Sequence, residues 1–164
     1  MTSITPYSLN AQNKQFPYFD EIRCSDLTPV ETVHENNWFK VLNRGGYFTI
    51  EYPLPQVIVL PIVDEQYILM VQCKRPVLGD ITLELPAGAT EEGESVLEGI
   101  VREFAEETGI SSIEPHRFTP QAPLAMNPNR TPLLAQTFQV ELTQQEFDNR
   151  SYHDHEIESV ELLE

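Results

Sequence analysis

The sequence is poor in basic residues. It has 10 Lys and Arg against 26 Asp and Glu in 164 residues, a formal net charge of −16. So little positive charge excludes the broad basic surface with which proteins bind nucleic acids or anionic membranes. We therefore expect no nucleic-acid partner and no membrane partner. An anionic small molecule would depend on metal ions and a few local Arg or Lys residues.

Cysteine and long hydrophobic runs are also scarce. Cys24 and Cys73 have no metal-ligand spacing and suggest no disulfide framework, which favours reduced thiols and a cytoplasmic location. No signal peptide is evident, and no apolar run reaches the roughly 18–20 residues that cross a bilayer. The length and the 40% hydrophobic content are typical of a globular protein with a single core.

Residues 88–110 are the most informative part of the chain. Ser95 followed by Glu98 is a capping box that predicts a helix from about Val96, and Gly109 suits the left-handed residue that ends one. At about 100° per residue, one face of this helix is apolar. We expect that face to consist of Leu97, Ile100, Val101 and Phe104.

A second face of the same helix is acidic and carries Glu103, Glu106 and Glu107, with Gly99 leaving space one turn earlier. Like charges at this spacing repel one another, and acids near a helix C-terminus oppose the macrodipole. One interpretation is a solvated acidic face on an ordinary amphipathic helix. The other is a cation site, for which carboxylates without a nearby His or Cys favour Mg²⁺ or Mn²⁺ over Zn²⁺.

The whole segment fits the pattern G-x5-E-x7-R-E-U-x-E-E-x-G-U, where U is apolar. The nine specified positions over 23 residues are Gly88, Glu94, Arg102, Glu103, Phe104, Glu106, Glu107, Gly109 and Ile110. A match of this length is not expected by chance. The chain therefore resembles the Nudix hydrolases, which cleave nucleoside diphosphates linked to another group.

The predicted strands agree with an α/β fold. Two of them, Trp38–Leu42 and Tyr47–Tyr52, flank a turn at Arg44-Gly45-Gly46 and predict a hairpin. The others are Val57–Val63, Tyr67–Cys73, Ile81–Leu85, Leu133–Leu142 and Ile157–Leu163. The resemblance implies the Nudix α/β/α sandwich, with a mixed sheet and a small N-terminal β region. We expect residues 1–35 to be an extended arm and residues 36–164, with the hairpin at about 38–52, to be the Nudix domain.

The resemblance also implies a role for each motif residue. Glu103 and Glu107 would be the principal catalytic metal ligands, with Glu106 and the backbone carbonyl of Ala87 as additional ligands. Gly88, Glu94 and Arg102 would be structural, the last two pairing to hold the loop against the helix.

Residues outside the motif resemble ADP-ribose pyrophosphatases and related nucleotide-sugar hydrolases. They are Leu83-Glu84-Leu85-Pro86-Ala87-Gly88 and Lys74-Arg75-Pro76. The strand that usually reads Arg-Gln-aromatic-Arg-Pro in that subgroup lacks its first Arg and its aromatic residue here. The resemblance implies metal-dependent hydrolysis of ADP-ribose or a related nucleoside diphosphate sugar to a nucleoside monophosphate and a sugar phosphate. It also implies a homodimer, because the N-terminal arm and hairpin resemble the part through which the subgroup dimerises.

Three residues are candidate substrate contacts. Arg75 could hold a diphosphate in a bidentate contact, or be a solvated charge at a strand end. Trp38 and, more weakly, Phe48 could stack on the base, although a single Trp more often belongs to a core.

The sequence offers three candidates for the general base. In the subgroup, a Glu in an acidic loop before the last strand positions or deprotonates the attacking water. The corresponding candidates here are Glu156, Asp154 and His153. A His titrates near pH 6.5 and so could serve as a base at neutral pH. We rank Glu156 first, because a carboxylate can both orient the water and contact a metal. A solvated polar loop is the remaining interpretation.

Two other functions remain open from the sequence. A housekeeping nucleoside triphosphate pyrophosphohydrolase would usually be shorter at the N-terminus and lack the Leu-Pro-Ala-Gly segment. A non-catalytic nucleotide-sugar-binding module would be expected to have lost part of the motif or to carry a second domain.

Overall fold

The computed structural model describes residue 24, residues 26–152 and residues 154–164. The chain divides into two units. Unit 1 comprises Met1–Pro55 and Ala122–Gln136, and unit 2 comprises Gln56–Gln121 and Thr137–Glu164. No helix among the described residues is long and apolar enough to span a bilayer.

Unit 1 contains a three-stranded antiparallel sheet with the order β1-β2-β3. Its strands are β1 (Val30–Glu35), β2 (Lys40–Arg44) and β3 (Tyr47–Glu51). Gly45 and Gly46 both have positive φ and form the turn expected between β2 and β3. Residues 30–35 were expected in the arm, but they pair with β2. Strand β2 begins after Trp38, because the Asn36 side chain accepts hydrogen bonds from the backbone N–H groups of Trp38 and Phe39 and makes a turn there.

A buried ion pair fixes the pairing of β2 with β3. The Arg44 guanidinium donates to both carboxylate oxygens of Glu51, at 2.6 Å and 3.0 Å, and Thr49 Oγ1 donates to the same carboxylate at 2.7 Å. Arg44 and Glu51 are both 8% exposed, so each satisfies the other's buried charge. A one-residue slip of β3 would place these groups on opposite faces of the sheet.

Unit 2 is built on a seven-stranded sheet with the order β10-β5-β4-β9-β8, on which β6 pairs with β5 and β7 pairs with β4. Its strands are β4 (Gln56–Val63), β5 (Tyr67–Arg75), β6 (Asp80–Glu84), β7 (Ala87–Ala89), β8 (Thr119–Pro120), β9 (Gln136–Leu142) and β10 (Ile157–Leu163). Its helices are α2 (Val96–Thr108), the 3-10 turn η1 (Pro115–Arg117) and α3 (Gln144–Asp148). The fold class is α/β, as expected.

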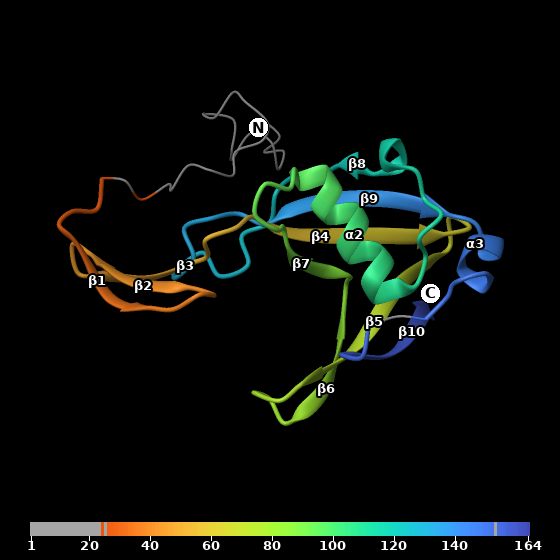
Figure 1. The fold of residues 1–164 in the computed structure, drawn as a ribbon, viewed down its shortest axis with the longest axis horizontal. Coiled ribbons are helices and arrows are strands. Elements are labelled where there is room, and N and C mark those ends of the chain that lie inside the picture. The colour runs from red at the N-terminus through yellow and green to blue at the C-terminus, as the bar shows by residue number, and fades with distance from the viewer. Residues whose placement is uncertain (1–23, 25, 153) are drawn as a thin grey trace, which may run out of the picture. The chain divides into compact units, whose positions relative to one another are not determined.

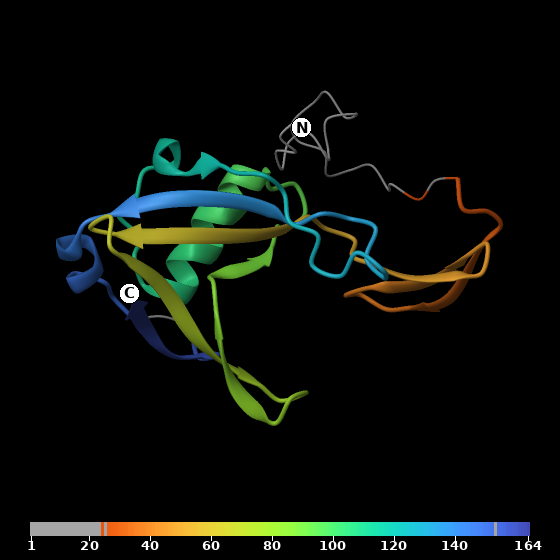
Figure 2. The same ribbon diagram turned by 180° about the vertical axis from the view of Figure 1, so that it is seen from behind.

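Helix α2 lies along one face of this sheet, over β4 and β9, as the two opposite views show (Figure 1 and Figure 2). The capping box at Ser95 and Glu98 is formed, and Gly109 ends the helix with φ +75°. Ile100 and Phe104 are buried against the sheet in one apolar cluster with strand residues such as Val59 and Val71.

Three details of the sequence prediction need correction. Leu97 is 38% exposed, because the buried stripe of α2 runs through Gly99, Ile100, Phe104 and Thr108 and Leu97 lies beside it. Helix α3 was missed, although Thr143 and Glu146 form a second capping box. Strand β7 was also missed, because a three-residue strand has too little periodicity to detect.

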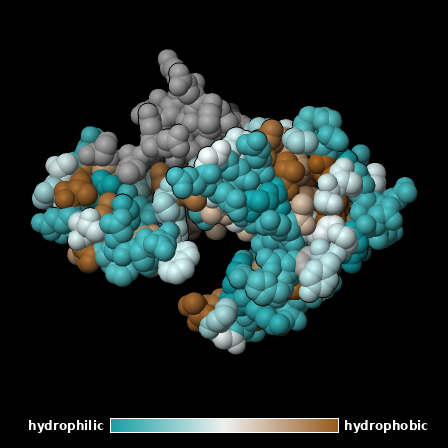
Figure 3. Space-filling model, viewed as in Figure 1, coloured by the Kyte–Doolittle hydropathy of each residue, from teal (hydrophilic) through white to brown (hydrophobic). Residues whose placement is uncertain are grey.

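The hairpin of β5 and β6 extends beyond the rest of the sheet of unit 2 (Figure 1). Its tip exposes hydrophobic side chains, with Val77 98% and Leu78 67% exposed (Figure 3). Strand β6 pairs only with β5 among the described residues.

Candidate active site

A cavity of about 320 Å³ in unit 2 collects most of the residues that the sequence singled out. It lies where the end of β5, the start of β7, the acidic face of α2 and the segment before β10 meet. Its lining residues are Arg75, Ala87, Gly88, Glu103, Glu106, Glu107, Asp154, Glu156 and Ile157.

Gly88 packs so closely against the carboxylate of Glu103 that a larger side chain would force this carboxylate to move. An added Cβ would overlap the carboxylate carbon and both oxygens of Glu103. Gly88 pairs with Val57 of β4, so its position is fixed by the sheet. The first Gly of the motif therefore allows a helix carboxylate to reach the backbone of β7.

Glu107 is the most deeply placed carboxylate of the cavity. Its Oε2 atom accepts a hydrogen bond from the backbone N–H of Ala87 at 2.8 Å. Burial raises the pKa of Glu107 to about 7, and the nearby Glu103 carboxylate adds to the increase. Burial also raises the pKa of Glu103. The cavity thus holds negative charge that the surrounding protein stabilises poorly.

Arg102 connects the loop of the motif to the acidic face. Its Nε and Nη2 atoms donate to the two oxygens of Glu94, each at 3.0 Å, and Nη2 also donates to the Ala89 carbonyl at 2.8 Å. Its Nη1 atom donates to Glu103 at 3.0 Å and to Glu106 at 3.1 Å. Arg102 therefore holds the loop against α2 through its pairing with Glu94. It also orients Glu103 and Glu106, two candidate metal ligands.

Gly99 was expected to leave space beside the acidic face of α2, but it packs against other residues. A Cβ at this position would lie 2.7 Å from Thr90 Cγ2 and 3.1 Å from Glu94 Oε2. Gly99 is buried and makes room for the loop that carries Glu94, and not for a ligand beside the acidic face.

The donor set of the cavity suits a hard divalent cation. Glu103, Glu106 and Glu107 supply carboxylate oxygens, no Cys or described His lines the cavity, and oxygen ligands of this kind prefer Mg²⁺ or Mn²⁺. Among the described residues, no group of three or more His, Cys, Asp or Glu side chains is already arranged to hold a metal ion. Arg102 and the Ala87 N–H hold the carboxylates in hydrogen bonds instead. Binding a cation would exchange some of these hydrogen bonds for metal contacts.

The C-terminus of α2 binds the segment that precedes β10. The N–H of Ser151 donates to the Gly109 carbonyl and the N–H of Asp154 donates to the Glu106 carbonyl, each at 2.8 Å. These bonds satisfy carbonyls that a helix end leaves unpaired. They bring Asp154 and Glu156 to the rim of the cavity. His153 lies outside the described residues.

Arg75 reaches the same cavity from the end of β5. Its Nε and Nη2 atoms donate to the two oxygens of Glu84, each at 2.8 Å, and its Nη1 atom lies 3.8 Å from Glu156 Oε2. Glu84 was not recognised from the sequence as a functional residue. Strand alternation places residues 75 and 84 on one face only once the β5–β6 register is known.

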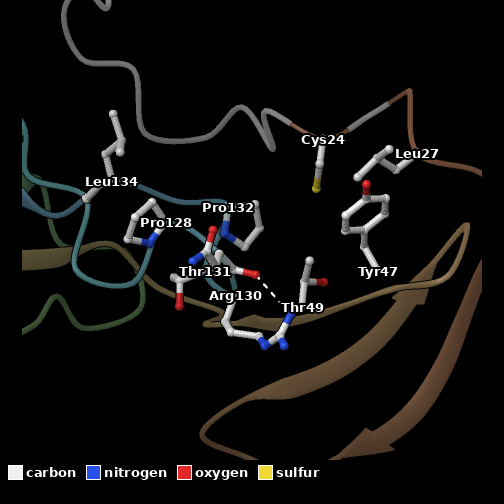
Figure 4. A pocket seen from close by; sticks show the side chains of 11 residues that line it. Cys24, Leu27, Tyr47, Thr49, Pro128, Arg130, Thr131, Pro132 and Leu134 are labelled. Atoms are coloured by element: carbon white, nitrogen blue, oxygen red, sulfur yellow. Dashed lines mark hydrogen bonds between the residues drawn. The ribbon is translucent and has the colours of Figure 1, made fainter.

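Trp38 and Phe48 belong to unit 1, where they are 74% and 49% exposed. Unit 1 has its own cavity of about 380 Å³, and neither Trp38 nor Phe48 lines it. Figure 4 shows this cavity between β3 residues Tyr47 and Thr49 and the segment from Pro128 to Leu134.

The family model of the NUDIX domain matches residues 53–164. The chain belongs to the Nudix family. It is accordingly a Nudix pyrophosphohydrolase with the α/β/α sandwich that its motif implies, and Nudix enzymes generally use divalent metal ions.

Other comparisons add information on the fold of this Nudix protein. The crystal structure of an ADP compounds hydrolase is similar, with a TM-score of 0.55 and 23% sequence identity over 82% of this chain and 74% of that chain. At this identity the similarity supports the fold. A comparison with curated protein sequences finds no match.

Proposed function

We propose that this Nudix enzyme hydrolyses the diphosphate bond of ADP-ribose or a related nucleoside diphosphate sugar, with Mg²⁺ or Mn²⁺ as cofactor. The products are a nucleoside monophosphate and a sugar phosphate. The observation that carries the proposal is the cavity in which the acidic face of α2 meets Arg75. The similar solved structure, an ADP compounds hydrolase, and the Leu-Pro-Ala-Gly segment before the motif support this substrate class.

The side chains of the cavity have complementary tasks in this reaction. When bound to the α2 carboxylates, a divalent cation neutralises phosphate charge and lowers the pKa of a water molecule. Arg102 orients Glu103 and Glu106 for that binding. Arg75 presents Nη1 to the diphosphate, since its Nε and Nη2 atoms each donate to Glu84. Trp38 and Phe48 remain proposed contacts of the base.

Glu156 is the proposed general base, with Asp154 and His153 as alternatives. The water oxygen attacks one phosphorus while its proton moves to the Glu156 carboxylate. The bond from that phosphorus to the bridging oxygen breaks, and the oxygen leaves with the second phosphoryl group. Glu156 suits this role because it lines the cavity and its side chain is 62% exposed, so water can reach it.

The substrate class is tested by measuring phosphate-ester release from nucleotide sugars, nucleoside triphosphates and dinucleotides with Mg²⁺ or Mn²⁺. We expect ADP-ribose or another nucleoside diphosphate sugar to be cleaved fastest, and excess EDTA to abolish turnover. Undiminished turnover in EDTA would contradict the metal assignment. A preference for triphosphates would support the housekeeping function instead, and binding without cleavage of any compound would indicate a binding module.

The base assignment is tested with Glu156→Gln, which keeps the shape of the side chain and removes its basicity. We expect kcat to fall by about 10²–10⁴. Glu158→Gln is the matched control, because Glu158 pairs with Lys74 and does not line the cavity. If Glu156→Gln retains wild-type kcat and either Asp154→Asn or His153→Ala loses it, the base is the residue whose substitution causes the loss.

A further inference from the structure

The guanidinium of Arg75 is held in place by another side chain of the protein. Two of its three guanidinium nitrogens donate to Glu84 in a fork, at 2.8 Å each. Nη1 is left on the side of the cavity, 3.8 Å from Glu156. A bidentate carboxylate contact fixes the plane of the guanidinium as well as its position.

Glu84 is itself held from a second direction. Thr82 Oγ1 donates to the Oε1 atom of Glu84 that also accepts from Arg75 Nε. In the β5–β6 register Arg75 pairs with Asp80, Cys73 with Thr82 and Val71 with Glu84, so Arg75, Thr82 and Glu84 share one face of the hairpin. Hydrogen bonds on this face therefore connect Thr82 to Glu84 and Glu84 to Arg75, which lines the cavity.

The cavity offers Arg75 several competing partners. Five carboxylates line it, those of Glu103, Glu106, Glu107, Asp154 and Glu156, and Arg75 is its only lining cation among the described residues. A long flexible side chain in this field would be drawn onto the nearest acid, and Glu156 is already within 4 Å. A partner on the far side of the guanidinium is needed to keep Nη1 available.

We propose that Glu84 is a positioning residue for catalysis: it holds the Arg75 guanidinium so that Nη1 faces the diphosphate and keeps only a long contact, 3.8 Å, with the cavity carboxylate of Glu156. This inference rests on the proposed function. Glu84 contacts neither the substrate nor the reacting atoms, and it acts through Arg75 alone.

A double-mutant cycle tests this, using Glu84→Gln, Arg75→Ala and the double variant with ADP-ribose or the best nucleotide sugar of the screen. We expect Glu84→Gln to raise KM about tenfold or more, the effect of weakening a charge-assisted contact, with a smaller change in kcat. In the Arg75→Ala background, Glu84→Gln should change KM less than twofold, because no guanidinium remains to be positioned. Effects that add fully in the double variant would overturn the inference.

Controls separate positioning from folding. Glu158→Gln removes a carboxylate from Lys74, the neighbour of Arg75 on the opposite face of β5, and should leave KM unchanged. Thr82→Val removes the second contact of Glu84, together with a long hydrogen bond to the Cys73 carbonyl at 3.5 Å, and should raise KM a few-fold in the same direction. If Glu84→Gln fails to fold, the Thr82→Val result decides, and an unchanged KM then overturns the inference.

Binding of α,β-methylene-ADP with Mg²⁺, measured by calorimetry, distinguishes this inference from the proposed function. Wild type should bind the compound, and Glu84→Gln should bind it about tenfold more weakly. If wild-type protein neither binds it nor cleaves any diphosphate compound, the proposed function fails. If wild type binds and cleaves but Glu84→Gln matches it, only the role of Glu84 is wrong.

Discussion

The three glutamates of α2 have different surroundings, although they lie on one helix face. Glu107 is partly buried and accepts a hydrogen bond from the Ala87 N–H, whereas Glu103 and Glu106 share the Nη1 atom of Arg102. Gly88 makes room for Glu103. Burial of like charges is unfavourable to the fold unless a cation or proton compensates it, so these residues favour ligand binding at the expense of stability.

Replacing Glu107 by Gln should abolish metal-dependent turnover and stabilise the metal-free protein near neutral pH. The folded-state pKa of Glu107 is raised from 4.5 to about 7, so its contribution to stability is present below about pH 4.5 and is lost as pH rises through about 7. In EDTA, we expect the Tm difference between Glu107→Gln and wild type to grow from pH 5 to pH 8, by about a few degrees. Thermal melts across this range check it. A difference that does not change with pH would contradict the buried-charge explanation.

Arg102→Ala should have the opposite effect on stability to Glu107→Gln. It removes the cation that pairs with Glu94, whose side chain is only 15% exposed, so a mostly buried carboxylate is left without a neutralising charge beside the loop. Unlike Glu107→Gln, this variant should lower both Tm and activity.

At the scale of elements, the contact between α2 and the segment before β10 assembles the site. The helix contributes the acidic face, the segment contributes Asp154 and Glu156, and hydrogen bonds to the Gly109 and Glu106 carbonyls join them. Gly109 has φ +75° and no room for a Cβ, because one would overlap the Ser151 backbone.

Gly109→Ala should therefore destabilise the protein and reduce kcat together. Gly93→Ala is a matched control, since Gly93 also has positive φ, +84°, but an added Cβ would meet nothing within 4 Å. We expect about 1 kcal/mol of destabilisation for Gly93→Ala from backbone strain alone, and at least about twice that for Gly109→Ala from the added overlap. Denaturant unfolding and kcat measurements check both. Equal losses for the two variants would show that the close approach to Ser151 has no energetic importance.

At the scale of the whole molecule, the net charge of −16 dominates the electrostatics. Six basic residues of the described chain pair with carboxylates: Lys40, Arg44, Lys74, Arg75, Arg102 and Arg117. Little positive charge is left to attract an anionic substrate, which agrees with the proposed dependence on divalent cations.

We predict that the protein is a homodimer in solution. The sheet of unit 1 exposes hydrophobic side chains, with Val33 57% and Phe48 49% exposed, and contiguous exposed apolar patches mark interaction sites in soluble proteins. Light scattering at micromolar concentration should give twice the monomer mass, and Phe48→Glu should shift the protein to monomer. A monomer mass for wild type would reject the prediction.

Much of unit 2 follows from the sequence, because the signals are local. The capping box at Ser95, the left-handed Gly109 and strand Ile157–Leu163 were all predicted close to their observed bounds. The acidic face of α2 follows from helical periodicity alone. Each of these depends on residues within about two turns or one strand of one another.

Other features were decided by the tertiary structure. The pairing of Arg75 with Glu84 depends on strand register, and the exposure of Leu97 depends on where α2 meets the sheet. Residues 30–35 became a strand because β2 was there to pair with them. The neighbourhood of Glu156 and Glu107 joins positions 49 residues apart through the carbonyls at the end of α2. Sequence periodicity determines which face of an element is polar, but burial, register and long-range hydrogen bonds are properties of the packed chain, and they determine which polar groups meet.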